Sequence, residues 1–450
     1  MKAFRVHARG RFARAMGFLQ WFNVWWSLGY VLFTATTATL MLLIPAVCLV
    51  RPVSHGAYAR VTSLVFACWW TSCLFITERL NGVGVRITGD ALPRNTPLLI
   101  IANHKCNLDW MFLWSAAVRT GSIWHVGLFR GTSCVSQIPQ TVWPYKTRGE
   151  CRRSTSDKAD TFLAKLKTPA VAKRELRVIP FFGWGCKLNG FAYISRKWSA
   201  DSEHLKTWAN TQFAKNAPGW VVIFPEGTRY TEANKQRSDV SCARDGIDVG
   251  SLSGEILRPK TKGLALLLRE NEKQREREKE SDGTAVKGTQ KAVKGTPKNT
   301  SFGVIVDMTI QYTDPQHEPV KGSALGTRCF GQLAKGSLPV RTCHVHFDVF
   351  DPGSVPTGDE TCNEWVLERW RKKAALLRSC AEFGQFQGVS EWSASGGSVP
   401  FVLQTFLRVF FVAQGLTCVA LLAYQPLFVA YAAVALGGLG LMCQLDPPTW

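Results

Sequence analysis

A histidine and an aspartate separated by four residues are the first candidates for chemistry in this 450-residue chain. His104 and Asp109 lie directly after the apolar run Leu98–Ala102. If that run is a buried strand and a helix follows it, the Asp109 carboxylate folds back to the imidazole, fixes its tautomer and stabilises its cation. The other ring nitrogen is then a general base for an attacking hydroxyl. For an isolated pair, a solvated turn histidine beside a helix-capping aspartate is the alternative.

A second segment, Phe224-Pro-Glu-Gly-Thr-Arg229, follows another apolar run. Pro225 ends strand pairing and Gly227 permits a tight turn. Glu226 and Arg229 are thereby expected at the same sheet edge as His104. An arginine in such a turn suits the bidentate binding of a phosphate. A structural Glu–Arg ion pair at a strand end is the alternative interpretation.

The elements that must position these residues form an α/β pattern between residues 81 and 380. Runs with strand character occur at Leu98–Ala102, Trp220–Phe224, Gly303–Tyr312 and Thr342–Phe350, and the clearest helical segments are Leu108–Val118 and Cys362–Ala381. Strands that alternate with helices favour a mainly parallel or mixed sheet covered by helices. Such folds bind their ligands at the carboxyl ends of the strands.

Taken together, the two segments resemble the glycerolipid acyltransferases of the 1-acylglycerol-3-phosphate acyltransferase family. The likeness continues in Ile179–Trp184, Gly190–Trp198, Leu257–Gly263 and Val306–Tyr312. The later blocks resemble a eukaryotic branch of multi-span endoplasmic-reticulum enzymes, which includes the lysocardiolipin and lysophosphatidylinositol acyltransferases. The resemblance implies the glycerolipid acyltransferase fold.

The resemblance also implies roles for single residues. His104 is the general base and Asp109 is its partner. The residues implied to bind the acceptor are Glu226, Gly227, Thr228, Arg229, Arg196 and Lys260, with Arg229 on the phosphate. Cys106 departs from the family, whose members often carry a serine there. Both catalytic groups are nevertheless in place.

Three apolar stretches contain no Asp, Glu, Lys or Arg: 18–50, 61–77 and 409–445. A membrane-spanning helix needs roughly 20 apolar residues. We therefore predict a basic N-terminus with membrane helices in 1–78 and a C-terminal transmembrane hairpin in 399–450. Between them we predict an acyltransferase domain in 79–383 and a linker in 384–398.

Two insertions are predicted inside the acyltransferase domain, at 148–177 and 269–300. The first is dense in basic and small polar residues. The second contains a short lysine-rich repeat and is predicted to be disordered, because it has too little apolar surface to bury.

The net charge of +21 raises the question of nucleic acid. No recognition motif accompanies the charge, so we assign it to anionic lipid headgroups and phosphate-bearing substrates. The 14 cysteines form no CxxC pair and are predicted to be reduced. His344 and His346 share one face of a predicted strand with Asp348, but no metal site is predicted, since no convincing third ligand from another segment is apparent.

The function implied is transfer of an acyl group from acyl-CoA to lysophosphatidic acid, giving phosphatidic acid at the cytosolic face of the endoplasmic-reticulum membrane. Acyl-CoA is a co-substrate, and no cofactor is expected. The expected partners are the two substrates and membrane lipids. Two alternatives stay open. One is a remodelling enzyme that uses lysophosphatidylinositol or lysocardiolipin, and the other is a catalytically silent membrane scaffold.

Overall fold

The computed structural model describes residues 81–119 (except 94 and 95), 170–214 (except 179–182, 184, 185, 188 and 189), 219–285 and 301–389 (except 326–328 and 335), together with seven isolated positions between 50 and 78. The predicted C-terminal hairpin lies outside these residues, as does nearly all of the predicted N-terminal membrane region. Within the described ranges, no helix is both long and apolar enough to cross a membrane.

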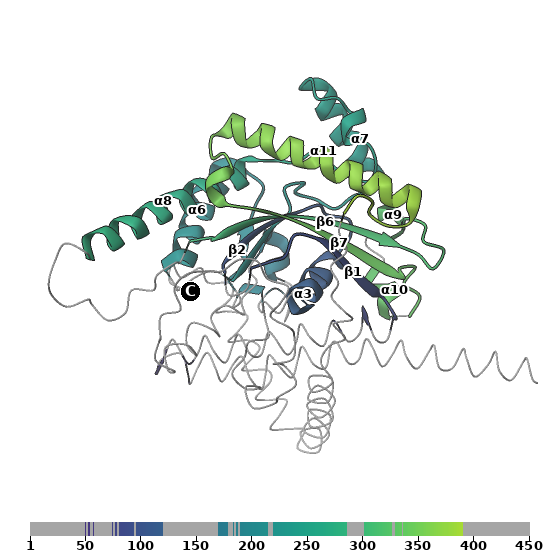
Figure 1. Cartoon of the computed structure of the whole chain (residues 1–450), viewed down its shortest axis with the longest axis horizontal. Helices are drawn as coiled ribbons and strands as arrows, with labels where there is room; N and C mark the ends of the chain where they lie inside the picture. The colour runs from purple at the N-terminus through teal and green to yellow at the C-terminus, as the bar shows by residue number, and fades with distance from the viewer. Residues whose placement is uncertain are drawn as a thin grey trace, which may run out of the picture.

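Five strands form one mixed sheet in the order β1-β7-β6-β2-β5 (Figure 1). They are β1 (Gly84–Gly89), β2 (Leu98–Ala102), β5 (Trp220–Ile223), β6 (Val304–Thr313) and β7 (Thr342–Phe350). β6 and β7 pair antiparallel, whereas the other three pairings are parallel. All five residues of β2 are buried, as expected for a parallel strand covered on both faces. The predicted mixed sheet is thus confirmed.

Helices cover both faces of this sheet (Figure 1). Helix α3 (Asp109–Arg119) packs on one face, and α6 (Trp198–Ala214), α8 (Lys262–Ala285) and α11 (Asp359–Phe383) pack on the other. The remaining elements are β3 (Val171–Lys173), β4 (Ala192–Ile194), α7 (Glu232–Arg244), α9 (Gly322–Leu325), α10 (Cys329–Ala334) and the 3₁₀ turns η7 (Arg174–Val178), η8 (Gly250–Leu252) and η9 (Pro352–Ser354). β3 and β4 form a separate parallel pair.

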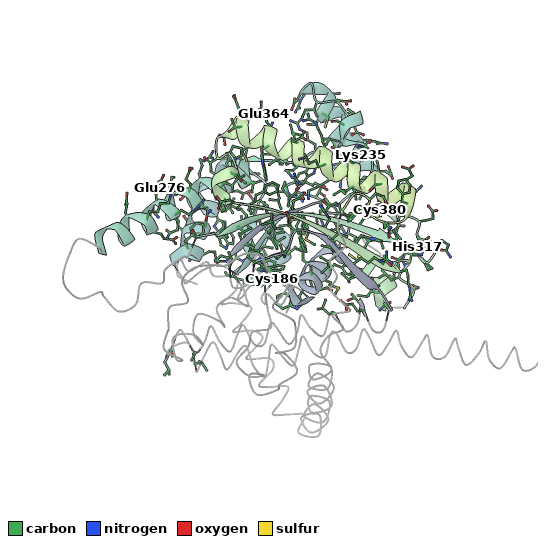
Figure 2. All side chains as sticks on the ribbon, in the orientation of Figure 1. Cys186, Lys235, Glu276, His317, Glu364 and Cys380 are labelled. Atoms are coloured by element: carbon green, nitrogen blue, oxygen red, sulfur yellow. The ribbon has the colours of Figure 1, made fainter. Side chains whose placement is uncertain are left out.

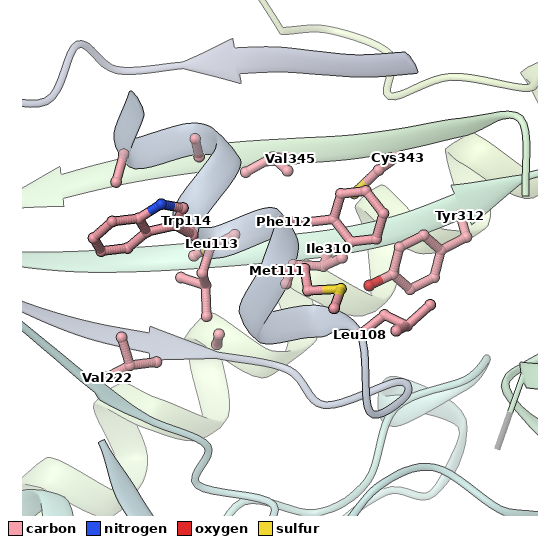
Figure 3. Close-up of a cluster of buried hydrophobic side chains, with 14 of the residues drawn as sticks. Leu108, Met111, Phe112, Leu113, Trp114, Val222, Ile310, Tyr312, Cys343 and Val345 are labelled. Atoms are coloured by element: carbon pink, nitrogen blue, oxygen red, sulfur yellow. The ribbon is translucent and has the colours of Figure 1, made fainter. Parts of the chain in front are cut away.

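The core on the α3 face is apolar and contains the alternate residues of β6 (Figure 3). Val306, Met308, Ile310 and Tyr312 face α3, because successive side chains of a strand point to opposite faces. The Tyr312 ring packs against Phe112 of α3, with the ring centroids 5.4 Å apart. Packing on this face of the sheet therefore fixes the position of α3, the helix that follows the His104 turn.

The opposite face of β6 is polar and pairs with α11. Asp307 accepts a hydrogen bond from Arg369 Nε at 2.7 Å, and its other oxygen lies 2.5 Å from Lys373 Nζ. Asp307 and Lys373 are each only 1% exposed. Arg369 also pairs with Asp348 on β7. A network of two cations and two carboxylates, in which only Asp348 is partly exposed, therefore joins α11 to the sheet.

The structure corrects three predicted boundaries. Residues 269–285 continue helix α8 and are not a disordered insertion, and Glu276 lies on its projecting end (Figure 2). The insertion predicted at 148–177 is too long, because Ala170 bridges Val222 of β5 and β3 follows it. The linker predicted from residue 384 starts later. Gly384 ends α11 in the left-handed conformation, and Phe386 beyond it is buried.

Candidate active site

The His104–Asp109 pair occupies the turn between β2 and α3. β2 ends at Ala102 and α3 begins at Asp109, so the two side chains lie at the carboxyl end of a central strand. Nδ1 of His104 is 2.7 Å from Oδ2 of Asp109. The Asp109 side chain is fully buried, whereas that of His104 is 22% exposed. With Nδ1 held by the carboxylate, Nε2 is the nitrogen that can take a proton from a substrate.

The Asp109 carboxylate is held by further donors. The backbone N–H groups of Lys105 and Cys106 donate to Oδ2 at 2.7 and 3.1 Å. The Tyr312 hydroxyl donates to Oδ1 at 2.5 Å, and the Cys106 thiol lies 3.5 Å from the same oxygen. The thiol thus occupies a place where a serine hydroxyl could bond the same carboxylate. The departure at Cys106 leaves the carboxylate well bonded.

Lys105, the residue after His104, points into the protein. Its side chain is fully buried, and Nζ lies 2.7 Å from Oε2 of Glu255 and donates to Oε1 of Gln311 at 2.6 Å. Asn103 similarly bonds the backbone of Ile310 with both ends of its amide. The residues on both sides of His104 therefore anchor its turn to β6.

The turn after β5 meets the His104 turn, as the sequence predicted. The backbone N–H of Tyr230 donates to the His104 carbonyl at 2.8 Å. The Phe224 ring stacks on the imidazole, with the centroids 4.3 Å apart. Gly227 adopts φ +67°, which side-chain-bearing residues rarely do, and closes the turn through a 2.9 Å bond to the Phe224 carbonyl. Two segments about 120 residues apart thus form one site, because β2 and β5 are parallel neighbours.

Glu226, within this turn, is buried, and its Oε1 has no hydrogen-bond partner among the residues that the structure describes. Burial raises the pKa of its carboxyl from the ordinary 4.5 to about 8, although backbone hydrogen bonds at His104 and Leu257 act in the opposite direction. At neutral pH, Glu226 is therefore mostly protonated and able to donate a hydrogen bond.

This raised pKa predicts a pH-dependent loss of stability. The unfolded carboxyl ionises near pH 4.5 but the folded one only near pH 8, so the free energy of unfolding falls as pH rises through this window. Glu226→Gln removes this loss, so the variant should gain stability relative to the wild type between pH 5 and 8. Thermal unfolding of both proteins across that range tests it. Glu364→Gln, at an exposed site on α11 (Figure 2), is the control and should show a constant offset. A constant offset for Glu226→Gln as well would contradict the prediction.

Cationic side chains gather around Gly227. Nη2 of Arg196 donates to the Gly227 carbonyl at 2.7 Å, and Lys260 Nζ would lie 3.8 Å from a Cβ at Gly227. Arg196 itself adopts φ +67°, a conformation that is costly for a residue with a side chain and common at functional sites. The pKa of Lys173, on β3, is lowered by partial burial and by the positive charges of Arg196 and Arg229. The four cations Lys173, Arg196, Arg229 and Lys260, here called the cation cluster, therefore lie together.

Sequence reasoning placed three of these cations and missed Lys173. Its segment was assigned to an insertion, although the short apolar-basic run Ala170-Val-Ala-Lys173 carries a weak strand signal. Thr228, predicted to bind the acceptor, is partly buried, and its hydroxyl accepts a hydrogen bond from the Asn234 side chain at 3.3 Å. Thr228 thus helps hold the turn.

The two strand histidines have partners of their own, away from His104. Nε2 of His344 lies 3.0 Å from the Thr313 hydroxyl, and Nδ1 of His346 lies 3.0 Å from that of Thr88. Nε2 of His346 is 3.4 Å from Asp348. Burial lowers the pKa of His344 to about 4. Both rings belong to the packing between β7 and the segment after α11.

Comparison with known proteins points to one family. The family model described as Acyltransferase matches residues 84–149 and 156–271. Lysocardiolipin acyltransferase 1 of Mus musculus is 25% identical over 360 residues, which cover 79% of this chain and 72% of the relative. A probable 1-acyl-sn-glycerol-3-phosphate acyltransferase 5 of Arabidopsis thaliana is 24% identical over 329 residues, covering 73% and 65%.

One solved structure, the 1-acyl-sn-glycerophosphate acyltransferase PlsC from Thermotoga maritima, aligns with 79% of this chain and 96% of its own. The sequence identity is 14% and the TM-score is 0.36.

Proposed function

Because the chain belongs to the acyltransferase family that includes the 1-acyl-sn-glycerol-3-phosphate acyltransferases, we propose that it transfers an acyl group from acyl-CoA to the free hydroxyl of lysophosphatidic acid. The product is phosphatidic acid. The observation that carries this proposal is the His104–Asp109 pair next to the cation cluster. The His104–Asp109 pair can activate a hydroxyl, and the cation cluster can bind the phosphate of the same molecule.

In the proposed reaction the acceptor hydroxyl attacks the thioester directly. His104 Nε2 takes the hydroxyl proton while the oxygen forms a bond to the acyl carbon, and the imidazolium is stabilised by Asp109. Collapse of the tetrahedral intermediate breaks the carbon–sulfur bond. The proton then passes from His104 to the coenzyme A thiolate. No acyl-enzyme is formed, so no nucleophilic side chain is needed.

The cation cluster is proposed to bind the acceptor phosphate, and Glu226 the glycerol. Arg229 and Arg196 can each present a planar fork to phosphate oxygens. A protonated Glu226 can donate a hydrogen bond to an oxygen of the glycerol part. The site is proposed to face the cytosol at the endoplasmic-reticulum membrane, where the acceptor enters from the lipid and acyl-CoA from water.

A remodelling acyltransferase is the second candidate, because a relative that aligns over 79% of this chain is named lysocardiolipin acyltransferase 1. A cation cluster binds a phosphate whatever headgroup is attached to that phosphate. The same arrangement therefore suits lysocardiolipin or lysophosphatidylinositol. A silent scaffold is disfavoured, because His104, Asp109, Glu226 and the cation cluster are not only present but assembled.

Acyl transfer by membranes containing the full chain tests the proposal. Labelled oleoyl-CoA is offered with lysophosphatidic acid, lysophosphatidylinositol, lysophosphatidylcholine or lysocardiolipin. We expect a product from lysophosphatidic acid that disappears with His104→Ala. A product from another acceptor instead would make the protein a remodelling enzyme. No transfer to any acceptor by folded protein would leave only the scaffold.

Lys173→Met provides a test of the phosphate site within the same assay. The change removes one cation and keeps the side-chain stem, so KM for lysophosphatidic acid should rise roughly tenfold while kcat changes little, given the ~1.5–3 kcal/mol of a charge-assisted hydrogen bond. Lys206→Met is the matched control, because Lys206 lies on α6 and pairs with the exposed Glu203. An unchanged KM in Lys173→Met would exclude Lys173 from acceptor binding.

A further inference from the structure

The hydroxyl of Tyr312 forms the contact on which this inference rests. Tyr312 lies on β6, is fully buried, and donates to Oδ1 of Asp109 at 2.5 Å. Figure 3 shows its hydroxyl oxygen directed toward the first turn of α3, between Leu108 and Met111. We infer that Tyr312 is a positioning residue of the active site, which holds the Asp109 carboxylate in the orientation that His104 needs. The inference rests on the proposed function.

Tyr312 is distinguished from the other described donors to Asp109 by where it comes from. The backbone N–H groups of Lys105 and Cys106, and the Cys106 thiol, belong to the same turn as the carboxylate. They move with Asp109 if the turn shifts. Tyr312 is 203 residues away in the sequence and stands on a central strand of the sheet. It is therefore the donor that ties the carboxylate to the rigid part of the fold.

The two oxygens of Asp109 have different main partners, while the Cys106 N–H contacts both, Oδ1 at 3.2 Å and Oδ2 at 3.1 Å. Oδ2 faces His104 Nδ1 at 2.7 Å and accepts from the Lys105 N–H, whereas Oδ1 accepts from Tyr312. Rotation of the carboxylate about its last side-chain bond would break the Tyr312 contact and the His104 contact together. Because hydrogen bonds to a charged acceptor are stronger than those between neutral groups, the Tyr312 contact resists that rotation.

The Tyr312 ring is itself held in place. The ring packs against Phe112. The backbone carbonyl of Tyr312 accepts a hydrogen bond from the Val320 N–H at 2.9 Å, and Tyr312 lies opposite Cys343 in the β6–β7 register. Burial, together with the negative charge of Asp109, raises the pKa of its hydroxyl well above 10. Tyr312 therefore remains a protonated donor throughout the pH range in which the enzyme could work.

Removing the hydroxyl should change both the rate and the titration of the base. In Tyr312→Phe the ring stays, but Asp109 loses one donor and directs more negative charge at His104, which favours the protonated imidazole. We expect kcat to fall roughly tenfold with little change in KM, and the acidic limb of the pH–rate profile to move up by about half a pH unit. The other titratable groups that interact with Asp109 are Cys106 from the turn and Glu226 after β5, and the variant leaves both in place.

A second readout does not depend on catalysis. Diethyl pyrocarbonate modifies neutral imidazole, so the pH dependence of His104 modification, followed by mass spectrometry of its peptide, reports the protonation of His104 directly. The modification midpoint should also move up by about half a pH unit in Tyr312→Phe. In contrast, 3-fluorotyrosine at position 312, whose hydroxyl is more acidic and donates more strongly, keeps the shape of the side chain and should move the midpoint down.

The control is Tyr193→Phe, which removes a tyrosine hydroxyl that donates to the Gly183 carbonyl instead. Its modification midpoint should equal that of the wild type, and thermal unfolding confirms that each variant is folded. A wild-type midpoint in both the Tyr312→Phe and the 3-fluorotyrosine proteins would overturn the positioning role. Absence of acyl transfer by the wild type would overturn the proposed function instead, and the modification midpoints would still decide the role of Tyr312.

Discussion

His104→Ala is expected to reduce acyl transfer to lysophosphatidic acid by about 10²–10⁴-fold. The imidazole is the group that can remove the hydroxyl proton, since its Nδ1 is held by Asp109 at 2.7 Å and its ring is 22% exposed at the strand end. Without it the acceptor must attack as a neutral alcohol. Initial rates with labelled oleoyl-CoA measure the loss, and KM for both substrates should change little.

Combining His104→Ala with Asp109→Asn makes this test sharper. If the pair acts as one unit, the double variant should be no slower than His104→Ala alone, because Asp109 acts only through the imidazole. His204→Ala, at an exposed position on α6, controls for the loss of a histidine and should transfer at the wild-type rate. Retention of more than about a tenth of the activity in His104→Ala would show that another group is the base.

Asp307→Asn is expected to destabilise the protein by about 3–5 kcal/mol. Asp307 is the buried partner of both Arg369 and Lys373, and all three side chains are at most 7% exposed. Removing its charge leaves the ammonium of Lys373, on α11, buried against β6 without its compensating carboxylate. For a domain of this size the unfolding midpoint should fall by roughly 10 °C, which thermal unfolding of the full chain in detergent measures.

Two further variants distinguish the effect on stability of removing a buried charge from that of removing any charge on α11. Glu368→Gln removes an acid from an exposed pair with Arg371 on the same helix and should cost less than about 1 kcal/mol. Asp307→Asn combined with Lys373→Met removes one charge of each sign, leaves Arg369 paired with Asp348, and should recover part of the lost stability. If Asp307→Asn proves no more costly than Glu368→Gln, the buried network does not stabilise α11.

Elements whose signals are local could be predicted from the sequence alone. The predicted bounds lie within a few residues of the observed ones for β2, β5, β6, β7, α3 and α11. This is because an apolar run, a strand period or a helix period depends only on neighbouring residues. The contact between His104 and Asp109 was predictable for the same reason, since both lie within one turn. Their meeting with the Phe224–Arg229 turn followed from one general rule, that the carboxyl ends of parallel strands share an edge.

Contacts between residues far apart in the sequence could not be predicted, because they depend on the fold as a whole. The adjacency of β6 and β2 places Tyr312 over Asp109, and the separate β3–β4 pair brings Lys173 to Arg196, although nothing near those residues in the sequence marks either contact. Lys373, in the charged segment of α11, is buried and paired with Asp307 of β6. Such pairings depend on which strands are adjacent and in what register, and these are set by the free energy of the whole core. A one-residue shift of β6 would turn Tyr312 away from Asp109 without altering a single local signal.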